Sequence, residues 1–154
     1  MTWDEVINSP YLRDLPFKIE MNKFGQILMS PASNKHGIMQ YKIASVIERV
    51  RKSGVIINEC SIQTSDGVKV ADVAWASDEF MLEHGEITPY PQAPEICVEL
   101  VSPSNSKAEM EHKVELYLAK GALEVWIVKA NKEIAFYSYT GQMKKSKLVP
   151  KLKL

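Results

Sequence analysis

Hydrophobic residues alternate with polar ones along several short stretches and recur at helical spacing along two longer ones. The alternating stretches predict a hairpin over residues 17–29 and strands over residues 55–60, 68–75 and 96–101. A second hairpin is predicted from residues 125–128 and 134–137. Helical spacing predicts helices over residues 36–52 and from a cap at residues 104–106 to residue 120, with a shorter helix over 79–84. In the strand over 68–75, we expect Val68, Val70, Asp72 and Ala74 to share one face.

The order of these elements predicts the fold class. A strand at 96–101, a helix and a strand at 125–128 form a crossover unit, which is right-handed by default. We therefore expect an α/β (α+β) fold, a mixed central β-sheet flanked by helices. The chain has 154 residues, of which 45% are hydrophobic, and contains no repeat or linker. This size suits one domain over residues 1–154.

The charges balance overall but are unevenly distributed. Residues 1–103 carry a net charge of −5 and residues 104–154 a net charge of +5. A neutral total disfavours a protein that binds nucleic acid over its whole surface, although a local patch can still do so. The exposed face of helix 36–52 carries such a patch, and Lys42, Arg49 and Lys52 are candidates for phosphate contacts or simply part of a solvated surface.

The remaining composition indicates a cytoplasmic protein. The N-terminal segment carries acids where a secretory leader carries basic residues, and no apolar run is long enough to span a membrane. Cys60 and Cys97 lie in apolar strands, so we expect reduced, buried thiols.

Two acids interrupt otherwise apolar strands. Asp72 lies within Val-Ala-Asp-Val-Ala and Glu99 within Cys-Val-Glu-Leu-Val. A buried carboxylate without a partner is costly, so each needs a cation or hydrogen-bond donors. If the two strands are neighbours, about 4.8 Å apart, both side chains can share one ion. Oxygen ligands of this kind suit Mg²⁺ or Mn²⁺, and a buried structural pairing is the alternative.

Lys113 is the third candidate. Glu99 lies about 10 Å before the end of its strand, at roughly 3.3 Å per residue. Lys113 lies about 12 Å into the following helix, at roughly 1.5 Å per residue, so the two side chains fall at nearly the same level. Glu109, one turn earlier, can pair with Lys113. A solvated helix lysine is the alternative.

Longer motifs surround these three residues. They are Gly67-Val-Lys-Val-Ala-Asp-Val-Ala-Trp75, Pro94-Glu-Ile-Cys-Val-Glu-Leu-Val-Ser-Pro-Ser104, Lys113-Val-Glu-Leu-Tyr117, Gly121 and Glu124-Val-Trp-Ile-Val128, preceded by Glu20, Gly25, Met29-Ser-Pro31 and His36. Together they resemble the Uma family of restriction endonucleases, part of the PD-(D/E)XK nuclease superfamily. The resemblance covers nearly the whole chain and implies a restriction-endonuclease-like fold.

The resemblance also implies roles for the candidate residues. Asp72 and Glu99 would be the catalytic acids that bind Mg²⁺ or Mn²⁺. Glu20 would be an auxiliary residue that completes the metal shell or positions a second ion, and a solvent-facing hairpin glutamate is the alternative. Glu109 is auxiliary only through its expected pairing with Lys113. The superfamily pattern places a lysine two residues after the second acid, where this chain has Val101. In the Uma family the lysine lies on the following helix, and Lys113 fits that position.

The resemblance departs from the family pattern at two further positions. A proline is expected where Ala71 stands, and an aspartate where Lys129 stands. Neither position is a proposed ligand. The expected activity is metal-dependent hydrolysis of DNA phosphodiester bonds by a homodimer, with the apolar hairpin over 125–137 as a candidate dimer surface. The alternative is a catalytically inactive nuclease-like module that binds nucleic acid or a protein partner.

Overall fold

The computed structural model describes residues 1–154 and contains one six-stranded sheet and a separate two-stranded hairpin. The strands are β1 (Phe17–Met21), β2 (Ile27–Pro31), β3 (Val55–Thr64), β4 (Gly67–Ala76), β5 (Ile96–Leu100), β6 (Glu124–Val128), β7 (Ile134–Ser138) and β8 (Gly141–Met143). The helices are α1 (Trp3–Asn8), α2 (Asn34–Val50), α3 (Asp78–His84) and α4 (Lys107–Ala119). No helix has both the length and the apolar character to cross a bilayer.

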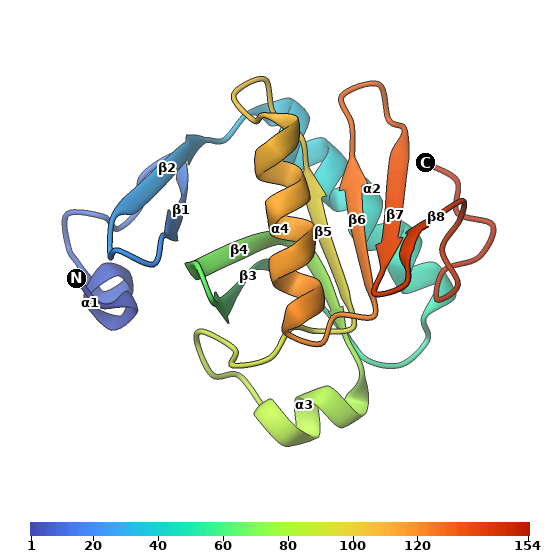
Figure 1. The fold of residues 1–154 in the computed structure, drawn as a ribbon, viewed down its shortest axis with the longest axis horizontal. Coiled ribbons are helices and arrows are strands. Elements are labelled where there is room, and N and C mark those ends of the chain that lie inside the picture. The colour runs from blue at the N-terminus through green and yellow to red at the C-terminus, as the bar shows by residue number, and fades with distance from the viewer.

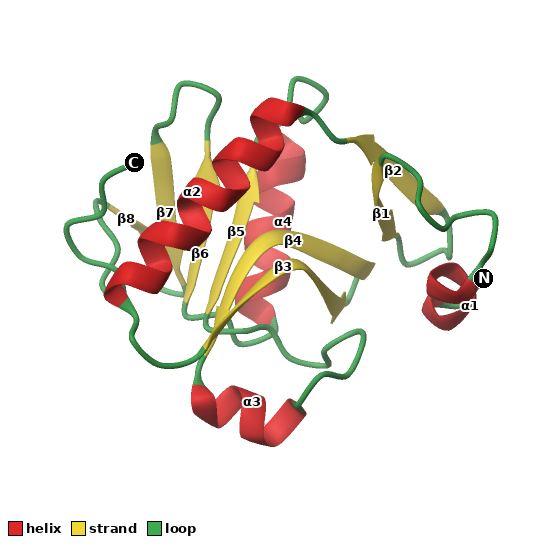
Figure 2. Ribbon diagram, turned by 180° about the vertical axis from the view of Figure 1, so that it is seen from behind, coloured by secondary structure: helices red, strands yellow, loops and turns green.

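The main sheet is mixed, in the spatial order β3-β4-β5-β6-β7-β8. Neighbouring strands run antiparallel, except for β5 and β6, which run parallel and are joined by α4. Helix α4 covers one face of the sheet (Figure 1), and α2 covers the other (Figure 2). The α+β fold with a mixed sheet between helices is therefore confirmed.

Each face of the sheet has its own hydrophobic core. Beneath α4, the core includes Tyr117, Cys97 and Val125, which are fully enclosed. Beneath α2, Ile43 and Ile47 pack against Trp126. The apolar residues of the β6–β7 hairpin belong to these two cores, so the expectation that this hairpin offers an apolar dimer surface is wrong.

The β1–β2 hairpin and α1 lie to one side of the main sheet, next to β4 (Figure 1). Ile19, Met21 and Ile27 of the hairpin pack against Val68 and Val70 of β4. The approach is so close at Gly67 that an added Cβ would lie 2.2 Å from the backbone oxygen of Met21. Gly67 also has φ of +77°, which other residues rarely adopt. This contact holds β1 beside the part of β4 that does not pair with β5.

The β3–β4 ladder is interrupted at Glu59 and Asp72. Asn58 pairs with Val73 and Cys60 pairs with Ala71, but the intervening residues do not pair. Glu59 has φ of 55°, in the left-handed region, which shifts the alternation of faces. Alternation also breaks on the facing strand β4: Ala71 and Ala74 both pack beneath α4 although they are three residues apart, whereas Val68 and Val70 pack against the hairpin. The expectation that these residues share one face is wrong for this reason.

Candidate functional site

A cleft of about 570 Å³ opens where the β1–β2 hairpin, the start of α2, β4, β5 and α4 meet. Ionisable residues outnumber hydrophobic ones in its lining. The ionisable residues are Lys18, Glu20, His36, Glu59, Asp66, Lys69, Asp72, Glu99, Glu109, His112 and Lys113. The cleft therefore contains all five acids and lysines that the sequence singled out as catalytic or auxiliary.

Asp72 and Glu99 lie side by side at the base of the cleft. Strands β4 and β5 pair antiparallel with Val73 opposite Val98, which puts the two acids at the next position along the ladder. Each is only 1% exposed. Oδ2 of Asp72 accepts a hydrogen bond from the backbone N–H of Leu100 at 2.7 Å. Oε1 of Glu99 accepts one from the Tyr117 hydroxyl, also at 2.7 Å.

Lys18 of β1 bridges these two carboxylates. Its Nζ lies 3.0 Å from Oδ1 of Asp72 and 3.1 Å from Oε2 of Glu99. Burial by itself lowers the pKa of Lys18, but attraction to Glu99, Asp72 and Glu20 outweighs it and holds the pKa well above its usual value. Lys18 is therefore a charged ammonium that both acids share.

Lys113 of α4 contacts Glu99 as well, together with Glu20. Its Nζ lies 2.8 Å from Oε1 of Glu20 and 3.3 Å from Oε1 of Glu99. The same Glu20 oxygen accepts a hydrogen bond from the backbone of Val70 at 2.8 Å. Burial raises the pKa of Glu20, but Lys18 and Lys113 outweigh this and the pKa is lowered. Glu20 and Lys113 thus belong to one buried network of charges with Glu99.

Glu109 does not pair with Lys113. Its carboxylate accepts a hydrogen bond from the backbone of Ser106 at 2.7 Å, and the Ser106 hydroxyl accepts one from the backbone of Glu109 at 3.1 Å. These two bonds form a capping box that satisfies the first turn of α4. The expected pairing is wrong because the carboxylate of Glu109 is hydrogen-bonded to the N-terminus of α4. Glu109 still lines the cleft.

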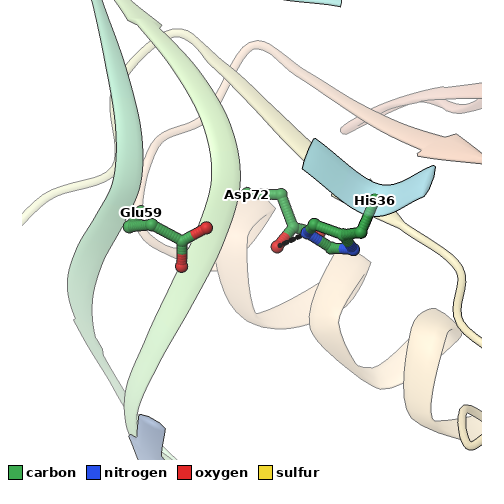
Figure 3. A group of neighbouring side chains, drawn as sticks. All are labelled: His36, Glu59 and Asp72. Atoms are coloured by element: carbon green, nitrogen blue, oxygen red, sulfur yellow. Dashed lines mark ion pairs between the residues drawn. The ribbon is translucent and has the colours of Figure 1, made fainter. Parts of the chain in front are cut away.

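The start of α2 contributes a further side chain to the cleft, that of His36. Nε2 of His36 lies 3.2 Å from Oδ1 of Asp72. One atom each of His36, Glu59 and Asp72 lie within 4.8 Å of one another, and Figure 3 shows the three side chains converging from α2, β3 and β4. The hydrogen bond to Asp72 raises the pKa of His36, and burial raises the pKa of Glu59.

The two central acids have opposite pKa shifts. Burial raises the pKa of Asp72, but the Lys18 charge and the hydrogen bonds from His36 and Leu100 outweigh it, and the pKa is lowered strongly. For Glu99, burial outweighs the attraction of Lys113 and Lys18, and the pKa is raised. Pairs of acids with divergent pKa values are common in catalytic sites.

The other predicted cations lie outside the cleft. Lys42, Arg49 and Lys52 are exposed, and none of them lines the cleft. They occupy the outer side of α2 and the residues after it, because the inner side packs Ile43 and Ile47 on the sheet. Their contact with phosphates stays a prediction.

The donor set of the cleft fits a divalent cation. Glu20, Glu59, Asp72 and Glu99 supply carboxylate oxygens, which Mg²⁺ and Mn²⁺ prefer. Two ammonium groups contact this set, so the four carboxylates outnumber their ammonium partners. The Lys18 ammonium between Asp72 and Glu99 marks a position that favours a cation.

Four residues of the site were not singled out by sequence reasoning for these roles. They are Lys18, Gln40, Glu59 and Tyr117. Lys18 is two positions from Glu20 in a strand, so the two share a face, and this spacing could have indicated it. Tyr117 has its ring buried in the core beneath α4, as expected for an apolar helix position, but its hydroxyl donates a hydrogen bond to Glu99.

Comparisons with known proteins identify the family of this chain and a protein of similar fold. The model of the Uma2 family, described as "Putative restriction endonuclease", matches residues 5–148. The fold is similar to that of a protein from Anabaena variabilis ATCC 29413, solved as a crystal structure and described as "a putative nuclease belonging to DUF820". The TM-score is 0.72 at 19% sequence identity, over 88% of this chain and 86% of the other. No curated protein matches the chain in sequence. Because the family model matches residues 5–148, almost the entire length, the chain belongs to the Uma2 family.

Proposed function

We propose that this protein is a metal-dependent endonuclease that hydrolyses DNA phosphodiester bonds. The observation that carries the proposal is the placement of the Asp72 and Glu99 carboxylates on adjacent strands, with Lys113 of α4 3.3 Å from Glu99. The family description supports a nuclease, and the proposed substrate and cofactor, DNA and Mg²⁺ or Mn²⁺, go beyond it.

Asp72 and Glu99 are the residues that would hold the cation. A bound divalent ion supplies a polarised phosphate oxygen and a water of lowered pKa. Two contacts orient the acids: the backbone N–H of Leu100 fixes Asp72, and the Tyr117 hydroxyl fixes Glu99. Because these donors are buried, the carboxylates are held in place before any ligand arrives.

Lys113 would act on the phosphate. Its ammonium, on the cleft side of Glu99, can stabilise negative charge that develops on phosphate oxygens during displacement. Glu20 holds Lys113 at 2.8 Å and is itself anchored by the backbone of Val70. Glu20 is therefore proposed as a positioning residue for Lys113.

A second candidate function is favoured by Lys18. Its ammonium already bridges Asp72 and Glu99, so each of these acids has a cationic partner without a metal ion. A catalytically inactive nuclease-like module that binds nucleic acid or a protein partner would keep such an arrangement. The two functions differ in a measurable way, since only the first requires Asp72 and Glu99 for phosphodiester cleavage.

Cleavage of supercoiled plasmid DNA in Mg²⁺ or Mn²⁺ tests the proposal. We expect nicked and linear products from the wild type, and a loss of at least a hundredfold in rate in Asp72→Asn, Glu99→Gln and Lys113→Met, in the range typical for such groups. Glu111→Gln, an exposed position on α4, is the matched control and should retain activity. Equal rates in wild type and the Asp72 and Glu99 variants would exclude these residues, and DNA binding without cleavage by the wild type would support the inactive module.

The assembly proposed for this enzyme is a homodimer in the cytoplasm. Two active sites brought together would allow both strands of a duplex to be cut. Sedimentation at micromolar concentration tests this, and a monomer under those conditions would count against it.

A further inference from the structure

His36, Glu59 and Asp72 converge on the side of the cleft next to α2, and no role in the proposed hydrolysis uses the first two. We propose that these three residues form a second cation site, specific for a transition metal such as Mn²⁺, Co²⁺ or Zn²⁺ over Mg²⁺. The site shares Asp72 with the Asp72–Glu99 pair but does not include Glu99. It goes beyond the proposed function, because cation binding here does not require nuclease activity.

The three ligand atoms come from three separate elements that the fold brings together. His36 lies in the first turn of α2, where its backbone N–H donates to the capping hydroxyl of Ser33 at 3.1 Å. Its Nε2 lies 3.2 Å from Oδ1 of Asp72, and an oxygen of Glu59 completes a group within 4.8 Å of one another. Figure 3 shows Glu59 directed toward this pair from the neighbouring strand. Such spacing suits three ligands around one ion.

Gln40 holds Glu59 and Asp72 in position through two hydrogen bonds. It lies one turn after His36 on α2, and its Nε2 donates to Oε1 of Glu59 at 2.8 Å and to the backbone oxygen of Asp72 at 2.7 Å. The bond to Glu59 uses Oε1, which leaves Oε2 for a cation. Hydrogen bonds that orient ligands in this way are typical of metal sites and strongly affect metal affinity.

The backbone of Glu59 also points to a ligand role. A glutamate at φ of 55° is strained, and glycine or asparagine would adopt this conformation at lower cost. In β3, Ile57 and Cys60 both pack toward the core beneath α4, which regular alternation forbids. The break at Glu59 lets its side chain leave that core and line the cleft. The chain therefore has a glutamate at a strained backbone position, where an uncharged residue such as asparagine or glycine would be easier to accommodate.

The chemistry of the three donors selects the cation. Mg²⁺ prefers oxygen ligands, whereas an imidazole nitrogen with two carboxylates suits Mn²⁺, Co²⁺ and Zn²⁺. Three protein ligands leave further coordination positions for water. The Asp72–Glu99 pair offers only oxygens, so the two positions differ in the ion they favour.

Binding of Mn²⁺ to the tag-free full-length protein tests the proposal, with electron spin echo envelope modulation to detect a directly bound imidazole nitrogen. We expect a ¹⁴N signal in the wild type that disappears in His36→Gln and persists in His112→Gln, the other cleft histidine. The signal should also persist in Glu99→Gln, so loss of cleavage in that variant would not remove this site. Absence of the ¹⁴N signal in the wild type, or its survival in His36→Gln, would overturn the proposal.

Glu59→Asn provides a second variant that should fold well, because asparagine tolerates the left-handed backbone. Its Mn²⁺ affinity should fall on the order of tenfold or more, while thermal stability without metal is kept or increased. By isothermal titration, the preference for Mn²⁺ over Mg²⁺ should also decrease in this variant and in His36→Gln. Unchanged affinity for Mn²⁺ in Glu59→Asn would contradict the proposal.

Discussion

The Nζ atom of Lys18 lies 3.0 Å from Oδ1 of Asp72 and brings a hairpin outside the main sheet into direct contact with its buried acids. The same ammonium contacts Glu99, so a single residue of β1 forms ion pairs with acids on both β4 and β5. Removal of one member of a buried ion pair leaves an uncompensated charge, which is strongly destabilising.

Lys18→Met should therefore destabilise the metal-free protein by roughly 3 kcal/mol, measured by urea unfolding. It should also increase the affinity for Mn²⁺, because the ammonium no longer competes for Asp72 and Glu99. Lys69→Met is the matched control, since Lys69 is buried but pairs with Asp66. The Lys69 variant can lose stability without any change in Mn²⁺ affinity. Weaker Mn²⁺ binding in Lys18→Met would show that Lys18 supports the cation site rather than competing for it.

Tyr117→Phe isolates the hydrogen bond to Glu99. The hydroxyl donates to Oε1 of Glu99 at 2.7 Å inside the protein, and phenylalanine preserves the ring packing. The loss of a donor to a buried charged group should cost about 2 kcal/mol in the free energy of unfolding. If plasmid nicking is present, its rate should fall as well, because Glu99 loses an orienting contact. Wild-type stability in Tyr117→Phe would mean that this bond contributes little.

Asp66 should make folding sensitive to acid. Burial raises its pKa, but the backbone N–H of Lys23 and the side chains of His112 and Lys69 outweigh this and the pKa is lowered. A carboxyl with a lowered folded pKa contributes stability above its unfolded pKa, near 4, and that contribution is lost as pH falls through the folded pKa. The stability difference between wild type and Asp66→Asn should therefore be present at pH 7 and shrink toward pH 3. Urea midpoints at several pH values check this, and a difference that grows toward pH 3 would contradict it.

The two thiols should be inert in the native protein. Cys60 and Cys97 are buried, and burial raises the pKa of Cys60 to about 12. Only the thiolate reacts rapidly with disulfide reagents. We expect almost no reaction with such a reagent at pH 8, and two equivalents on unfolding in urea. Rapid labelling of the folded protein would show that this core opens readily.

The positions of the three main candidates could be anticipated because they depend on regular geometry. Strand rise and helix rise placed Lys113 level with Glu99, and the structure brings the two within 3.3 Å. The capping of α4 by Glu109 could also be predicted from the sequence, because Ser106 and Glu109 have the spacing of a capping box. Helical spacing alone also allows Glu109 to pair with Lys113, but the carboxylate of Glu109 accepts from the backbone N–H of Ser106 instead.

Lys18 and Glu59 could not be placed in the same way. The contact of Lys18 with Asp72 depends on how the hairpin docks against β4, which is set by tertiary packing around Gly67. The left-handed backbone of Glu59 has no sequence signal, because the residue is neither glycine nor asparagine. Both residues therefore emerge only from the folded structure.

Anomalous diffraction from crystals of the wild-type protein soaked in Mn²⁺ tests the central claim most directly. The proposed function predicts a peak within coordination distance of carboxylate oxygens from both Asp72 and Glu99, with the Lys18 ammonium displaced from its position between them. A saturated crystal in which Lys18 still bridges Asp72 and Glu99, with no peak between these acids, would contradict it.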